Sequence, residues 1–238
     1  MAERLAGRAD VSAVLSLAGR TVSPAAQPVP VRIGGFGGAD GLADYLLLQR
    51  MDALIDATHP YAANISANAI RAIAQARIAF LALRRTPWPQ ISGDHWAEVG
   101  DVSEAVSALG TAPRRVFLTL GRKELEPFRG APQHEYLVRS VDTVDPPLAA
   151  PRVSYINARG PFLEADERAL LQQHRIEILV SKNSGGSATY GKIAAARALR
   201  LPVIMMRRPV LPPAPMVETV EQALAWIDHS CLQVARGV

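Results

Sequence analysis

Cysteine, aromatic residues and long apolar runs are all scarce in this chain, and each shortage excludes a class of protein. The single cysteine, Cys231, excludes an internal disulfide and any metal site built from several cysteines. No run of about 18 or more apolar residues is present, so we expect no membrane-spanning helix. A basic segment followed by an apolar leader is also missing. Together these features predict a cytoplasmic protein without a membrane partner.

Charge of either sign is modest as well. Lys and Arg number 26 against 22 Asp and Glu, which gives a net charge of +4. Aromatic residues make up only 5% of the sequence, whereas nucleic-acid-binding surfaces usually combine a basic face with stacking aromatics. Basic residues occur instead as dispersed pairs, such as Arg84-Arg85, which suit a multiply anionic small molecule. We therefore expect no nucleic-acid partner. We also expect the protein to be a monomer or a weak homo-oligomer.

The most informative stretch runs from Ile176 to Pro209. A short apolar run, Ile176–Val180, precedes a polar turn with two glycines, an alanine-rich helix from about Thr189 to Arg200, and a second apolar run, Val203–Met206. This order predicts a β-α-β unit. Ligands bind at such turns in open α/β sheets because helix N-termini and free backbone N–H groups converge there. The alternative is a solvated loop with a Ser/Thr helix cap.

The same alternation of apolar strands and amphipathic helices predicts an α/β protein with parallel sheets. Strands are expected at residues 13–17, 29–33, 53–56, 79–83, 116–120, 135–139, 153–157, 176–180 and 203–206. Thr111-Ala112-Pro113 resembles a hinge, so we expect two Rossmann-like domains, residues 1–112 and 113–238. Five of the strands end in a small or polar turn, which predicts a cleft between the two sheets.

The first residues predict that part of the N-terminal domain precedes them. Met1–Gly7 has the composition of the end of a helix, and Ala13–Leu17 is expected to be the second strand of its domain. A doubly wound domain normally begins with a strand, a glycine-rich turn and a whole helix. We therefore expect the natural product to begin roughly 15 residues upstream.

His59 is the one histidine that directly follows a predicted buried strand. It could act as a general acid, since histidine titrates near neutral pH, or it could only fix the turn before the next helix. The other histidines are scattered, so no metal site is expected. No GxSxG or other nucleophile motif is present, which favours chemistry carried out by a cofactor.

Six motifs in order resemble one enzyme family: SLAGRT (16–21), GGFGG (34–38), DATHPYA (56–62), FLTLGRKEL (117–125), ARGPF (158–162) and SKNSGGSATYGK (181–192). Together they look like the precorrin-6A and cobalt-precorrin-6A reductases of cobalamin biosynthesis. The resemblance implies two Rossmann-like domains with cofactor and substrate in the cleft between them. It implies hydride transfer from NADPH, with NADH less favoured, to the tetrapyrrole precorrin-6A, giving precorrin-6B. A metal-free and a cobalt-containing substrate both remain open. The family's N-terminal Gly-Gly-Thr turn is absent.

The resemblance and the strand-end turns together suggest the site residues. The cofactor set is Ser16, Ala18, Gly19, Arg20, Thr21, Gly35, Phe36, Gly37, Asp56, Ala57, Thr58, Asn183, Ser184 and Gly185. The substrate set is Arg84, Arg85, Gly121, Arg122, Arg159, Gly160, Lys182, Thr189, Tyr190 and Arg208. Candidates for the proton donor are His59, Tyr61, Lys182 and water.

Two further expectations concern individual residues. Arg20 follows the strand that faces the adenosine ribose, where an arginine accommodates a 2′-phosphate, so it predicts NADPH over NADH. Lys182 and Asn183 are expected in a polar turn outside the core, so that replacing either by alanine impairs turnover with little loss of stability. The rival functions are a non-catalytic nucleotide-binding regulator and a Rossmann-like group transferase.

Overall fold

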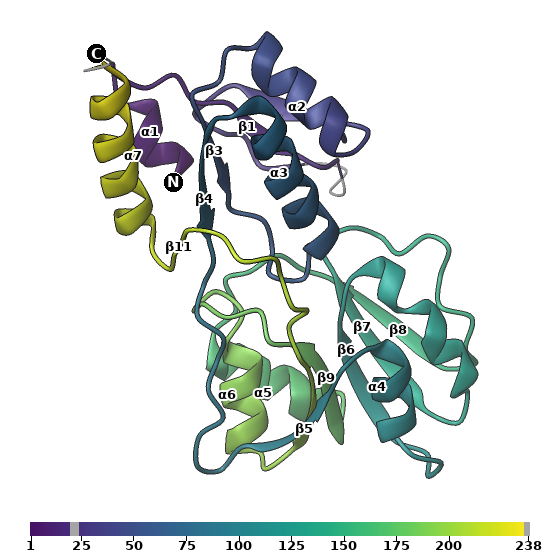
Figure 1. Cartoon of the computed structure of the whole chain (residues 1–238). Coiled ribbons are helices and arrows are strands. Elements are labelled where there is room, and N and C mark those ends of the chain that lie inside the picture. The colour runs from purple at the N-terminus through teal and green to yellow at the C-terminus, as the bar shows by residue number, and fades with distance from the viewer. Residues whose placement is uncertain (20–23, 236–238) are drawn as a thin grey trace. The chain divides into compact units, whose positions relative to one another are not determined.

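The computed structural model describes residues 1–19 and 24–235 and divides the chain into two compact units (Figure 1). Unit 1 consists of Met1–Arg85 and Val210–Val238, and unit 2 consists of Thr86–Pro209. The chain therefore leaves unit 1 once, forms all of unit 2, and then returns. Arg20 and Thr21, which the sequence assigns to the cofactor, lie outside the described residues.

Unit 2 contains a six-stranded sheet in which all neighbouring strands are parallel. In spatial order the strands are β5 (His95–Val99), β10 (Pro202–Met206), β9 (Ile178–Lys182), β6 (Arg115–Thr119), β7 (Glu135–Ser140) and β8 (Val153–Asn157). Successive residues of β9 and β10 are buried, which is typical of strands covered on both faces. Because the strands are parallel, their carboxyl ends share one edge of the sheet, which we call the carboxyl edge of unit 2.

The helices of unit 2 cover this sheet. They are α4 (Val102–Ala108), α5 (Glu164–Gln173) and α6 (Gly191–Ala198), with two short 3-10 turns, η1 (Arg122–Glu124) and η2 (Glu126–Gly130). Helices α5 and α6 pack against each other, and Leu171 and Ile193 from them join a buried cluster with Phe117 and Leu179 of the sheet. Asp101 caps α4 by accepting a hydrogen bond from the Glu104 N–H at 2.9 Å.

Unit 1 contains two smaller parallel sheets. One pairs β1 (Leu15–Leu17) with β2 (Val31–Ile33), and the other has the order β11 (Met216–Val217), β4 (Ala79–Leu83) and β3 (Ala53–Asp56). Its helices are α1 (Ala2–Ala6), α2 (Ala39–Leu48), α3 (Ala63–Ala76) and α7 (Val220–Ala235). Helices α2 and α3 lie side by side and share one apolar cluster, whereas α1 and α7 share another (Figure 1).

The fold class that the sequence predicts is confirmed, since both units are α/β with parallel sheets. The division of the chain differs from the expected 1–112 and 113–238. Strand β5, which the sequence did not predict, pairs with β10 and so carries residues 86–112 into unit 2. Strand β11 pairs with β4, which returns the C-terminal segment to unit 1. Both pairings join residues far apart in the chain, so no local pattern encodes them.

Two kinds of feature are absent from the described residues. None of the helices there combines the length and the apolar character needed to cross a lipid bilayer. In that same part of the chain, no three or more His, Cys, Asp or Glu side chains are grouped so that they could hold a metal ion.

Candidate functional site

The carboxyl edge of unit 2 gathers the substrate residues predicted for this half of the chain. Arg208 follows β10, Lys182 ends β9, Arg122 follows β6 and Arg159 follows β8. The remaining members belong to the same turns and are Gly121, Gly160, Thr189 and Tyr190. The parallel topology thus places several cationic side chains at one edge of one sheet, which suits a ligand that carries several negative charges.

Lys182 has a carboxylate partner that the sequence did not connect to it. Its ammonium group forms an ion pair with Glu124 Oε1, while Glu124 Oε2 accepts a hydrogen bond from the Gly121 N–H at 2.7 Å. A Cβ on Gly121 would lie 2.9 Å from that oxygen, so a larger residue there would require the Glu124 carboxylate to shift. The Lys182 and Glu124 side chains are 14% and 28% exposed, so both reach the surface in part at this edge.

Asn183 is buried, so the expectation that it lies outside the core is wrong. It is only 8% exposed, its Oδ1 accepts a hydrogen bond from the Trp88 N–H at 2.8 Å, and its Nδ2 donates to the Trp88 carbonyl at 2.9 Å. The Trp88 indole Nε1 in turn donates to the Gly186 carbonyl at 2.8 Å. The side chain of Asn183 therefore holds the loop before β5 against the turn after β9, a role that local sequence does not reveal.

The turn itself, residues 181–186, is enclosed by the first and last residues of unit 2. Gly185 has a φ of +65°, and a Cβ there would lie 2.2 Å from the Thr86 carbonyl oxygen and 2.5 Å from Arg208 Nη2. Arg208 Nε also donates a hydrogen bond to the Asn183 carbonyl at 2.8 Å. Gly185 is therefore required by both backbone conformation and space, and Ser184 beside it is half-buried.

A group of three buried charged residues includes Lys192, the second residue of helix α6, together with Arg139 of β7 and Glu167 of α5. Arg139 and Glu167 form a buried ion pair with two hydrogen bonds, of which Nη2 to Oε2 is 2.9 Å, and the guanidinium stacks 3.8 Å from the centre of the Phe162 ring. Lys192 lies close to this pair. Its burial, and then the charge of Arg139, lower the pKa of Lys192 to about 7, while Glu167 opposes the change.

In unit 1, the segment Asp56–Tyr61 follows β3 and leads into α3. Asp56 Oδ1 accepts hydrogen bonds from the Thr58 N–H at 3.1 Å and the Thr58 hydroxyl at 2.6 Å, and Oδ2 accepts one from Ser66 at 2.6 Å. This buried carboxylate orders the turn and ties it to α3, which agrees with the purely structural alternative for the segment. Ala57 and His59 are its exposed members, and His59 Nδ1 accepts a hydrogen bond from the Tyr61 N–H at 3.3 Å.

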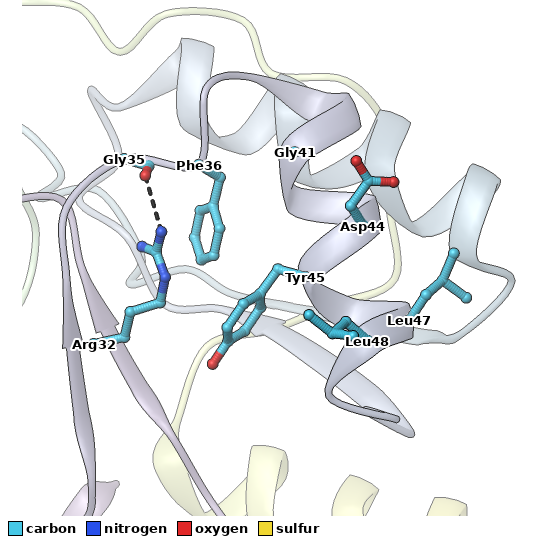
Figure 2. A pocket seen from close by; sticks show the side chains of 8 residues that line it. All are labelled: Arg32, Gly35, Phe36, Gly41, Asp44, Tyr45, Leu47 and Leu48. Atoms are coloured by element: carbon cyan, nitrogen blue, oxygen red, sulfur yellow. Dashed lines mark hydrogen bonds between the residues drawn. The ribbon is translucent and has the colours of Figure 1, made fainter.

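A pocket of about 620 Å³ lies between β2 and α2 (Figure 2). Arg32, which the sequence did not single out, forms one wall, with its guanidinium 3.7 Å from the centre of the Phe36 ring and 5.3 Å from that of Tyr45. Its two terminal nitrogens donate to the Gly34 and Gly35 carbonyls at 2.7 and 3.0 Å. Gly35 and Phe36 of the predicted cofactor set therefore line this open pocket, and the Arg32 guanidinium holds their turn.

The other predicted residues of unit 1 lie in β1 or in the segments that follow β1, β2 and β4. Ser16 lies in β1, and Ala18 and Gly19 follow it next to the turn after β2, whose Gly34 N–H donates to the Leu17 carbonyl at 2.8 Å. Gly37 has a φ of +79° and precedes α2. Arg84 and Arg85 follow β4, and Arg84 Nη2 is enclosed without a hydrogen-bond partner among the described residues.

Known proteins resemble this chain over both units. The family model described as Precorrin-6x reductase CbiJ/CobK matches residues 1–228. A precorrin-6A reductase from Sinorhizobium sp is 53% identical over 229 residues, which cover 96% of this chain and 88% of that protein. A second precorrin-6A reductase, from Rhodobacter capsulatus, is 47% identical, and the match covers 95% of this chain and 90% of that protein. Among solved structures, CobK precorrin-6A reductase superposes with a TM-score of 0.88 at 46% identity, covering 91% of this chain and 86% of that one.

Proposed function

This chain belongs to the precorrin-6x reductase family, and on that premise we propose that it reduces precorrin-6A to precorrin-6B with NADPH as the hydride source. The chain is an oxidoreductase of cobalamin biosynthesis. The observation that carries the finer proposal is the family match over residues 1–228, which includes the strand-end turns of both units. The relatives at 53% and 47% identity are named for precorrin-6A, which favours the metal-free substrate.

We assign the nicotinamide cofactor to the turns of unit 1. When bound, it supplies the hydride. The turn after β2 fits a ligand with phosphate groups, because Gly34, Gly37 and Gly38 all have positive φ, and a Cβ on any of them would meet no atom within 4 Å. Such an open glycine backbone allows close approach of an anionic group to the N–H groups of the chain. Arg20, outside the described residues, is proposed to accommodate the 2′-phosphate.

We assign the tetrapyrrole carboxylates to the carboxyl edge of unit 2, where Arg122, Arg159 and Arg208 supply the positive charge. Reduction by a hydride also requires one proton. Lys182 is the proposed donor, because it lies at this edge and is paired with Glu124, which can return the proton from solvent. His59 and Tyr61 of unit 1 are the alternative proton donors. Substituting each of the three residues in turn tests which of them turnover requires.

The test is to incubate the full chain with NADPH and precorrin-6A while following NADPH absorbance and the mass of the tetrapyrrole. We expect loss of NADPH and a product with two more hydrogen atoms. A regulator would bind NADPH without oxidising it, and a group transferase would consume an activated donor and leave NADPH unchanged. Absence of oxidation by folded protein would refute the proposal. Parallel reactions with NADH and with the cobalt complex establish the choice of cofactor and substrate.

A further inference from the structure

We propose that residues 185–189 and the ammonium group of Lys192 form a binding site for an oxyanion, either a carboxylate or a phosphate group of a ligand. The identity of that ligand rests on the proposed reductase function, but binding at the site does not require turnover. The proposal combines three observations: a run of backbone donors, a buried cation next to it, and an unbalanced positive charge.

The backbone donors are five consecutive N–H groups, those of residues 185–189. No hydrogen bond to any of them is found among the described residues. Gly185 and Gly186 have φ values of +65° and +73°, and successive N–H groups in such conformations form concave sites that bind anions. The next N–H, that of Tyr190, donates to the Ser187 carbonyl at 3.1 Å, and α6 then begins without a side-chain cap.

Lys192 supplies the second and independent observation. It is the second residue of α6 and is only 5% exposed, yet within the described part of the chain no hydrogen bond or ion pair reaches its ammonium group. Nζ lies 5.7 Å from the centre of the Trp88 ring, and the indole nitrogen of the same ring donates to Gly186. Trp88 thus contacts both the turn that carries the free N–H groups and the lysine.

The charges around Lys192 do not balance. Arg139 on β7 and Glu167 on α5 are the charged groups that act on it, and they satisfy each other through a buried pair with two hydrogen bonds. A protonated Lys192 therefore leaves one uncompensated positive charge in the interior, which is unfavourable unless an anion pairs with it. An oxyanion at residues 185–189 would provide that partner, and the lowered pKa of Lys192 would then return toward its ordinary value.

The test compares Lys192→Met with Lys123→Met, the same substitution at an exposed lysine in η1. Fluorescence titrations measure the Kd for NADPH and, separately, for precorrin-6A. Loss of one charge-assisted hydrogen bond should weaken binding of the ligand whose oxyanion occupies the site by roughly 10- to 100-fold. The other ligand and the Lys123→Met variant should be unaffected. The ligand that loses affinity identifies the group, a carboxylate of the tetrapyrrole or a phosphate of the dinucleotide.

Inorganic phosphate provides a probe that is independent of both ligands. It should raise the melting temperature of the wild type and not that of Lys192→Met. If Lys192→Met does not melt cooperatively, Gly186→Ala, which disfavours the positive φ, is judged by the same criteria. Unchanged affinity of the folded variant for both ligands overturns the site and leaves the reductase function intact. Wild-type protein that binds NADPH without oxidising it overturns the function and not the site.

Discussion

Asn183→Ala is expected to lower the stability of unit 2 substantially. The substitution removes both hydrogen bonds to Trp88 and leaves the buried N–H and carbonyl of that residue without partners. Each unsatisfied buried group costs about 1–3 kcal/mol, so the expected loss in the free energy of unfolding is about 2–6 kcal/mol. Water that enters the vacated space brings the value toward the lower end. Loss of Trp88 packing against the turn should also release the Gly186 carbonyl from the indole nitrogen.

The measurement is equilibrium unfolding in urea, monitored by tryptophan fluorescence, for the wild type, Asn183→Ala and Asn157→Ala. Asn157 is the matched control, because it is exposed in β8 and its hydrogen bonds to Ser140 and Thr143 are long, 3.4 and 3.5 Å. It should change stability by less than about 0.5 kcal/mol. If Asn183→Ala is as stable as Asn157→Ala, the bonds to Trp88 do not hold the turn. The assignment of Asn183 to the cofactor-binding set would then be favoured again.

Three further results are expected. Lys192 has a lower pKa in the folded chain than when unfolded, so the unfolded state binds more protons between about pH 7 and pH 10. The free energy of unfolding of the wild type, relative to that of Lys192→Met, should therefore rise with pH in that window. If urea melts show a difference that does not change with pH, the burial argument is refuted. Gly185→Ala should lose more than about 1 kcal/mol because of its positive φ and the Thr86 carbonyl, whereas Gly130→Ala, with open space and ordinary φ, should not; equal melting temperatures contradict this. Arg20→Ala should raise the KM for NADPH much more than that for NADH, and equal effects in steady-state kinetics place the 2′-phosphate elsewhere.

Local sequence patterns were sufficient for most of the fold. Apolar runs such as Ile178–Val180 and Val203–Met206 predict strands because both faces of the sheet are covered and every side chain must be apolar. Strand β5 was missed because His95 and Glu98 interrupt its apolar residues, as charged residues can in an edge strand. Helix α5 was missed because only Glu167 and Leu171 of its residues are buried, so its sequence shows little apolar periodicity.

The sequence predicts a ligand site at the turn after β9, but it does not predict the contacts that hold this turn in place. A turn with two glycines after a buried strand indicates a ligand site wherever the strands are parallel. The partners of that turn come from elsewhere, since Glu124 is 58 residues from Lys182 and Trp88 is 95 residues from Asn183. Glu124 lies within the FLTLGRKEL motif, which was the only sequence signal available for it. Which carboxylate meets which lysine depends on strand order, and strand order is a property of the whole sheet.

The return of the chain to unit 1 has a consequence for synthesis on the ribosome. Strand β4 ends at Leu83 and its neighbour β11 begins at Met216, so 216 − 83 = 133 positions separate the two pairing partners. At about 5–20 residues per second, β4 waits on the order of 10 s for that neighbour, while every strand of unit 2 has already emerged. During this interval the nascent chain exposes one side of β4 as an unpaired edge, which can join strands of other chains. The sheet that begins with β3 and β4 is thus among the last parts of the fold to be completed, because Met216–Val217 is synthesised only after all of unit 2.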